Sequence, residues 1–186
     1  MPKQTYQYKI ADSILGMVPD NFALTIDEYY RIYTFFVTYS MCDKQSAKKR
    51  SFSDYGWQNG NIKNTALGNA LAAVLNLNRN PHFIFTDKNE LGTKFNALDL
   101  PDGIATNLAY ERAVVGKTSE SNNYMKLFYR IRDGFAHGKF KLRFSTTNEK
   151  MVVIQDDDGH NVTARIIIKL DTLLNFVSAI DINGLI

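Results

Sequence analysis

The feature that most constrains the fold is a change in hydrophobic period at Gly138. After it, Phe140, Leu142 and Phe144 alternate with basic residues, which predicts a half-buried strand with one basic face. Before it, apolar residues follow Asn122 at the spacing of an amphipathic helix: Tyr124, Leu127, Phe128, Ile131 and Phe135. Because glycine suits the left-handed cap that ends a helix, the chain is expected to turn from helix to strand here.

The pattern after Gly138 predicts a small antiparallel sheet. Three strands are expected, at 139–144, 151–155 and 162–169. An Asp-rich turn at 156–160 joins the last two strands into a hairpin. A final helix over 171–182 begins with Asp171 as its N-cap. We therefore predict a β insertion, either a hairpin or three strands, over 139–169.

The residues before this region are predicted to be mostly helical. Thr25 and Glu28 match a capping box, which starts a tyrosine-rich helix that ends near Asp43. Apolar residues cover much of that helix, so we expect it to be well buried. Two further helices are expected, over 62–78 and Ile104–Val115. The stretch 83–98 between them is ambiguous.

These elements predict a mainly α fold. A helical bundle over 20–137 is followed by the β insertion and the C-terminal helix, all within a single domain over 1–186. A chain of 186 residues has the length of one domain and can bury a core without disulfides. Cys42 is the only cysteine, which excludes an intrachain disulfide and a cysteine-based zinc cage.

Charge and hydropathy narrow the classes further. No apolar run approaches the roughly 18 residues that indicate a membrane span. The first residues lack the apolar core of a signal peptide, so we expect a cytoplasmic protein. The formal net charge of +3 is too small to indicate a nucleic-acid partner by itself. The distribution of charge along the chain is more informative.

One basic stretch lies beside aromatic residues within 43–61. Four cations precede three aromatic residues, in the order Lys44, Lys48, Lys49, Arg50, Phe52, Tyr55 and Trp57. This composition is typical of platforms that bind single-stranded RNA. The interpretation that we favour is a solvated charge run followed by loop aromatics that plug the core.

Histidines are the natural candidates for chemistry, because the common nucleotide-binding, zinc-protease and serine-hydrolase motifs are absent. His82 follows a proline and has no cluster of carboxylates nearby. His160 lies in a turn with Asp156 and Asp158, but hard cations need more ligands than one such turn offers. We therefore expect no metal and no cofactor.

His137 differs because it ends the amphipathic helix in a strongly basic segment. From Lys126 to Arg143 there are six basic residues and one acid, which makes a local field for an anion. Arginine matches phosphate oxygens bidentately, and histidine can move a proton near neutral pH. Together they suffice for RNA cleavage in which the ribose 2′-hydroxyl attacks its own phosphate and leaves a 2′,3′-cyclic phosphate.

Two questions stay open from spacing alone. On an ideal helix Arg130 lies almost in line with His137 and Arg132 lies to the side, so either arginine could serve. A structural interpretation also fits, since a histidine before a glycine cap complements the helix dipole. Cations opposite an apolar stripe also commonly form a solvated face.

At these residues the sequence resembles the HEPN domain superfamily. The motif of that family is an arginine, four to six residues and a histidine, with a polar residue directly after the arginine. Arg132, Asp133 and His137 match it with four residues between arginine and histidine. The phrase Leu-Phe-Tyr-Arg-Ile-Arg-Asp-Gly-Phe-Ala-His-Gly is similar to the motif helix of many members, and the resemblance covers roughly residues 120–180.

The resemblance implies a helical bundle that pairs as a homodimer around a composite, metal-independent endoribonuclease site. His137 would be the general acid and base, Arg132 the phosphate clamp and Asp133 the polar helper. Further cations are expected to bind RNA: Arg130, Lys139, Lys141 and Arg143. Many members are toxins or antiviral-defence effectors, so an antitoxin or a defence partner is a candidate. The alternative is a non-catalytic HEPN module that binds RNA, a nucleotide or a partner protein.

Overall fold

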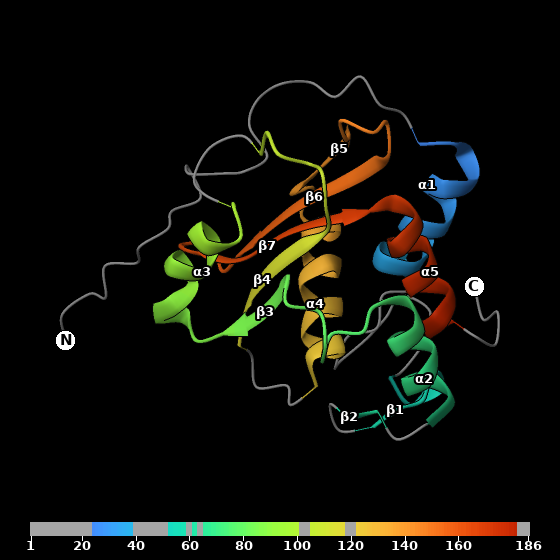
Figure 1. The fold of residues 1–186 in the computed structure, drawn as a ribbon. Helices are drawn as coiled ribbons and strands as arrows, with labels where there is room; N and C mark the ends of the chain where they lie inside the picture. Colours follow the sequence, from blue (N-terminus) through green and yellow to red (C-terminus); the bar gives the residue numbers. More distant parts are fainter. Residues whose placement is uncertain are drawn as a thin grey trace.

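The central feature of the fold is a five-stranded mixed sheet (Figure 1). A computed structural model describes residues 24–38, 52–58, 61–62, 65–100, 105–117 and 122–181. The strands of the sheet are β3 (Phe83–Thr86), β4 (Arg112–Gly116), β5 (Phe140–Phe144), β6 (Lys150–Asp157) and β7 (Val162–Lys169). Their order is β3-β4-β7-β6-β5, with β3 and β4 parallel and every other pair antiparallel.

Helices pack on both faces of this sheet. One face carries α1 (Ile26–Tyr33), the π-helical turn η1 (Thr34–Thr38), α2 (Thr65–Val74), α4 (Asn123–Ala136) and α5 (Leu170–Ile180). Their buried side chains form one hydrophobic cluster with sheet residues such as Val152, Ile154 and Ile166. The opposite face is covered by α3 (Leu91–Ala97), which follows the short η3 (Lys88–Glu90). There Phe95 packs in a second cluster with Val114 and Val153.

A two-stranded hairpin lies outside the main sheet. It consists of β1 (Trp57–Gln58) and β2 (Asn61–Ile62) and follows the 3-10 helix η2 (Phe52–Tyr55). Tyr55 and Trp57 are both buried in the larger cluster. This burial agrees with the interpretation that aromatic residues of this segment plug the core, while the four cations before them lie outside the described residues.

The predicted mainly α bundle is wrong. Residues 20–137 contribute two strands to the main sheet, and β4 occupies the end of the helix predicted over Ile104–Val115. The ambiguous 83–98 holds β3, η3 and α3. β4 is buried at every position, and such a strand shows a continuous apolar run that periodicity cannot distinguish from a buried helix. The strands of 139–169 are therefore part of a larger sheet rather than a small insertion.

The elements with clear periodicity are confirmed. β7 has the predicted bounds, β5 begins one residue later than predicted and ends as predicted, and β6 extends the predicted strand at both ends, from Lys150 to Asp157. The Asn122 side chain caps α4 by accepting a hydrogen bond from the Tyr124 N–H. The last helix begins one residue early, so Asp171 lies in its first turn rather than at its N-cap.

The corner between α4 and β5 is closed by Gly138, as predicted. Its φ of 66° lies in the left-handed region. The Gly138 N–H donates to the Phe135 carbonyl at 3.2 Å, and the Lys139 N–H donates to the Gly134 carbonyl at 2.7 Å. These two bonds form a Schellman motif, which satisfies the last carbonyls of α4 and fixes where β5 begins.

Gly134 allows α4 to approach β6 closely. A Cβ at Gly134 would lie 2.3 Å from Cγ2 of Ile154, a fully buried and branched side chain. At Gly68 in α2, a Cβ would meet, among the described residues, Cγ2 of Ile62 at 3.5 Å. The same substitution is therefore expected to have opposite effects in the two helices.

We predict that Gly134→Ala lowers the free energy of unfolding by about 1–3 kcal/mol, because α4 or Ile154 must move. Gly68→Ala is expected to raise it by up to about 1 kcal/mol, through the better helix propensity of alanine. Urea denaturation of both variants measures the two values. Equal shifts in the two variants would contradict the close approach of α4 and β6.

The tyrosine-rich helix is only partly as predicted. Its capping box is present, since the Glu28 N–H donates to Thr25 Oγ1 and the Thr25 N–H donates to Glu28 Oε2. However, α1 is not well buried, because Tyr29, Tyr30 and Tyr33 are exposed. The buried apolar residues are instead Ile32, on the inner side of α1, and Phe35 and Phe36, in the π-helical turn. Within the described residues, no helix is long and apolar enough to cross a membrane.

Candidate functional site

The three predicted catalytic residues lie at the C-terminal end of α4. Arg132 and Asp133 belong to its last turns, and His137 is the residue that caps it. The His137 N–H donates to the Asp133 carbonyl at 2.9 Å, so the helical turn continues to the histidine. Asp133 and His137 are four residues apart and lie on the same side of the helix. The structure therefore places Asp133 between the other two groups: it pairs with Arg132 and lies one turn before His137.

Arg132 is partly exposed and is held in place by its neighbours. Its guanidinium forms an ion pair with Asp133 at 2.5 Å and lies 5.5 Å from the centre of the Tyr129 ring. The Arg132 and Asp133 side chains remain 22% and 25% exposed. A guanidinium in this position can still exchange the carboxylate for a phosphate, because part of its surface faces solvent.

Arg130 has a different environment. Its Nη1 lies 2.7 Å from Oδ2 of Asp156, and the two side chains are only 14% and 2% exposed. The Thr163 hydroxyl donates to the same oxygen at 2.5 Å. Burial raises the pKa of the Asp156 carboxyl, while Thr163 and Arg130 act to lower it. The buried pair connects α4 to β6, so Arg130 has a structural contact that Arg132 lacks.

His137 is exposed, and within the described residues its imidazole has no hydrogen-bond partner. Both ring nitrogens are thus accessible to a ligand. A carboxylate or carbonyl that fixes the tautomer of a catalytic histidine is not present among those residues. The site has an accessible acid–base group at the end of the helix that carries Arg132, and the described residues supply no preformed orienting partner for the imidazole.

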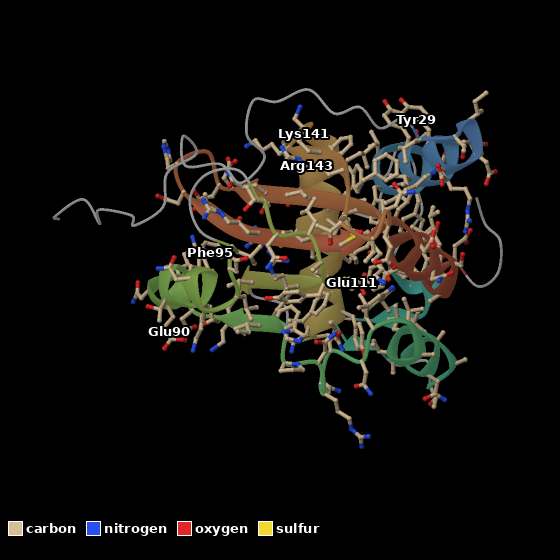
Figure 2. All side chains as sticks on the ribbon, turned by 45° about the horizontal axis from the view of Figure 1, so that its top comes forward. Tyr29, Glu90, Phe95, Glu111, Lys141 and Arg143 are labelled. Atoms are coloured by element: carbon tan, nitrogen blue, oxygen red, sulfur yellow. The ribbon has the colours of Figure 1, made fainter. Side chains whose placement is uncertain are left out.

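The cations predicted to bind RNA separate into two groups. Lys139 forms an ion pair with Asp157 at 2.5 Å and, like Arg130, is neutralised by the end of β6. Lys141 and Arg143 lie on one face of β5, opposite Val153 and Met151 of β6 (Figure 2). Both are half-buried, and Arg143 Nη1 donates to the Ala105 carbonyl at 3.3 Å.

Sequence reasoning missed the role of Asp156 and Asp157. The sequence predicts a turn at Asp156 and Asp157, but both lie in the last part of β6, and their carboxylates pair with Arg130 and Lys139. In the folded protein, these two carboxylates therefore neutralise part of the positive charge counted from Lys126 to Arg143. The signal in the sequence was the apolar run before Asp156. If the strand alternation is continued through that run, the Asp156 side chain falls on the face of the sheet that α4 covers.

In the part of the chain that the structure describes, no group of three or more His, Cys, Asp or Glu residues could hold a metal ion. His160 and its turn are held by Asp158, whose Oδ1 accepts from the His160 and Asn161 N–H groups. The His82 ring contacts the Tyr110 ring at an angle of 56°, with the centroids 4.9 Å apart.

Comparison with known proteins gives no family for this chain. No protein-family model matches it, and neither a curated protein nor a solved structure shows a significant match. The resemblance to the HEPN superfamily therefore stays a prediction that depends on the α4 motif alone.

Proposed function

We propose that the protein is an endoribonuclease whose working side chains are Arg132 and His137. The observation that supports this proposal is the difference between the environments of the two arginines of α4. Arg130 is fixed to the buried Asp156, whereas Arg132 and His137 are both accessible on the last turns of the helix. Arg132 and its neighbour Asp133 are also the residues that match the motif.

The chemistry needs only these groups and the RNA itself. The His137 imidazole accepts the proton of the ribose 2′-hydroxyl while that oxygen attacks phosphorus. The bond from phosphorus to the 5′-oxygen breaks, and the leaving oxygen takes a proton from this imidazolium or from that of a second copy. The Arg132 guanidinium stabilises the charge on the phosphoryl oxygens. The products are a 2′,3′-cyclic phosphate and a free 5′-hydroxyl.

The first experiment is cleavage of total RNA in EDTA by the wild type and by His137→Ala. We expect cleavage by the wild type and a rate at least about 100-fold lower for the variant, because an acid–base group is lost. His160→Ala is the matched control, since His160 is also exposed but lies in the turn between β6 and β7. Equal rates for the wild type and His137→Ala would refute the proposal.

A second candidate is RNA binding without cleavage. It is supported by Lys141 on β5, whose ammonium has no partner within the described residues, and by the adjacent Arg143. Binding that weakens steeply with salt, in a preparation that leaves RNA intact, would favour this function. Cleavage that depends on His137 would favour the first.

A further inference from the structure

The outer side of α1 carries an apolar stripe that no other described element covers. Its residues are Ile26, Tyr29, Tyr30 and Tyr33, which are 90%, 55%, 61% and 46% exposed. Tyr29 and Tyr33 stack on each other, with ring centroids 5.4 Å apart and an angle of 13° between the planes. Figure 2 shows Tyr29 at the margin of the molecule, above the helix that carries it.

Phe144 extends this surface onto the sheet. It is 44% exposed and lies opposite Lys150 in the β5–β6 pair, so both side chains are on the same face. The Lys150 ammonium contacts Oε1 of Glu28 at 2.9 Å, which brings the beginning of α1 beside Phe144. We call Ile26, Tyr29, Tyr30, Tyr33 and Phe144 together the α1 patch.

The charges around the α1 patch do not suit a nucleic acid. Asp27 and Glu28 lie in the first turn of α1, while the cations near it in the described part of the chain are Arg31 and Lys150. Lys150 is paired with Glu28, and Arg31 donates to the Ser178 hydroxyl at 2.6 Å. Among the described residues the surroundings are therefore balanced in charge, without the excess of cations that backbone phosphates require. A protein surface is the better match.

The spacing of the residues in the stripe is the same whether it is read from the N-terminus or from the C-terminus of α1. The intervals between its residues are three, one and three, so a two-fold axis between Tyr29 and Tyr30 maps the stripe onto itself. A second, antiparallel α1 would then place Ile26 against the partner's Tyr33. The acidic first turn of one copy would lie beside Arg31 of the other, which is the favourable arrangement of charge.

The area of the α1 patch is sufficient for such a pair. Aromatic residues bury about 150–250 Å² each, so the exposed fractions correspond to about 600 Å² per copy and about 1,200 Å² in total. This value is at the lower limit of specific interfaces. We propose that the α1 patch is the contact surface of a homodimer in which two α1 helices pack antiparallel. The evidence for this pair is separate from that for the proposed function.

The test is the mass of the full chain in solution by sedimentation, up to about 0.1 mM. We expect the wild type to associate as a dimer and Tyr29→Glu/Tyr30→Glu to have at least about 100-fold weaker association, because four carboxylates would meet at the axis. Asn89→Glu/Thr93→Glu adds the same charge to exposed positions around α3 and is expected to remain dimeric. A monomeric wild type, or a dimer that the double tyrosine variant retains, would overturn the proposal.

A crosslink tests the antiparallel arrangement directly. In a Cys42→Ser background, Tyr30→Cys lies next to the axis and should form a disulfide-linked dimer on mild oxidation. Thr93→Cys, on the exposed side of α3, should not. A dimer that Tyr30→Cys fails to crosslink would contradict the pairing. Neither experiment uses RNA, so a failure of the dimer and a failure of cleavage are distinguishable.

Discussion

Replacing Asp156 with alanine is expected to lower the free energy of unfolding by about 3–5 kcal/mol, because it leaves the Arg130 guanidinium buried without its counter-charge. The Thr163 hydroxyl loses its acceptor in the same variant. Both effects act on the contact between α4 and the hairpin of β6 and β7. Urea denaturation followed by circular dichroism measures the change.

Two further variants test whether this loss of stability comes from breaking a buried ion pair. Asp87→Ala removes a carboxylate from the exposed ion pair with Lys117 and is expected to cost at most about 1 kcal/mol. Arg130→Met/Asp156→Leu removes both buried charges and is expected to be near the wild type in stability. A double variant as unstable as Asp156→Ala would contradict this explanation.

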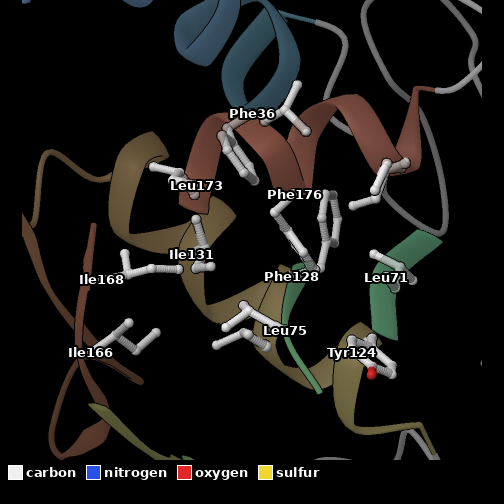
Figure 3. Close-up of a cluster of buried hydrophobic side chains, with 14 of the residues drawn as sticks. Phe36, Leu71, Leu75, Tyr124, Phe128, Ile131, Ile166, Ile168, Leu173 and Phe176 are labelled. Atoms are coloured by element: carbon white, nitrogen blue, oxygen red, sulfur yellow. The ribbon is translucent and has the colours of Figure 1, made fainter. Parts of the chain in front are cut away.

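Phe128→Ala is expected to lower the free energy of unfolding by a similar amount, about 3–5 kcal/mol. Phe128 is fully buried on α4, at the centre of the larger cluster (Figure 3). Its ring centroid lies 6.0 Å from that of Phe35 and 5.9 Å from that of Phe36, so it joins α4 to the π-helical turn. The truncation would leave a cavity that these rings cannot fill.

The same denaturation experiment measures this cost, with Phe128→Leu as the graded control. Leucine retains much of the buried volume, so its cost should be less than half that of alanine. An unchanged denaturant slope in both variants would show that the folded and unfolded states keep their compactness. If Phe128→Ala cost less than about 1 kcal/mol, the described packing of α4 on η1 would be refuted.

The parts of the fold that follow a clear period could be predicted from the sequence. β5, β6 and β7 follow from alternation, and the helix before Gly138 follows from its apolar stripe. β3 and β4 could not be predicted, because they are short and one of them is buried on both faces. Their pairing is also non-local, since β4 pairs with β7, which begins more than forty residues later.

The stripe of α1 illustrates a different limit. The sequence shows apolar residues on several sides of this helix but cannot show which side meets the core. In the structure Ile32, Phe35 and Phe36 have that position, and the tyrosines face outward. Tyrosine tolerates both environments, since its ring is apolar and its hydroxyl is polar.

The candidate site shows the same limit for charged residues. The spacing places Arg130 and Arg132 near His137 but cannot reveal that Asp156, 26 residues after Arg130, occupies one of them. A contact of that kind depends on how α4 lies on β6, which the close approach at Gly134 determines. Local periodicity therefore identifies the helix that carries the motif but does not identify which arginine is accessible.

The strand order has a consequence for the synthesis of the chain. β7, the central strand, is the last strand to leave the ribosome, and it separates β3 and β4 from β5 and β6. Before Val162–Lys169 emerge, β4 has β3 on one side and lacks its antiparallel neighbour on the other. The nascent sheet therefore consists of two independent ribbons, and one late segment joins them.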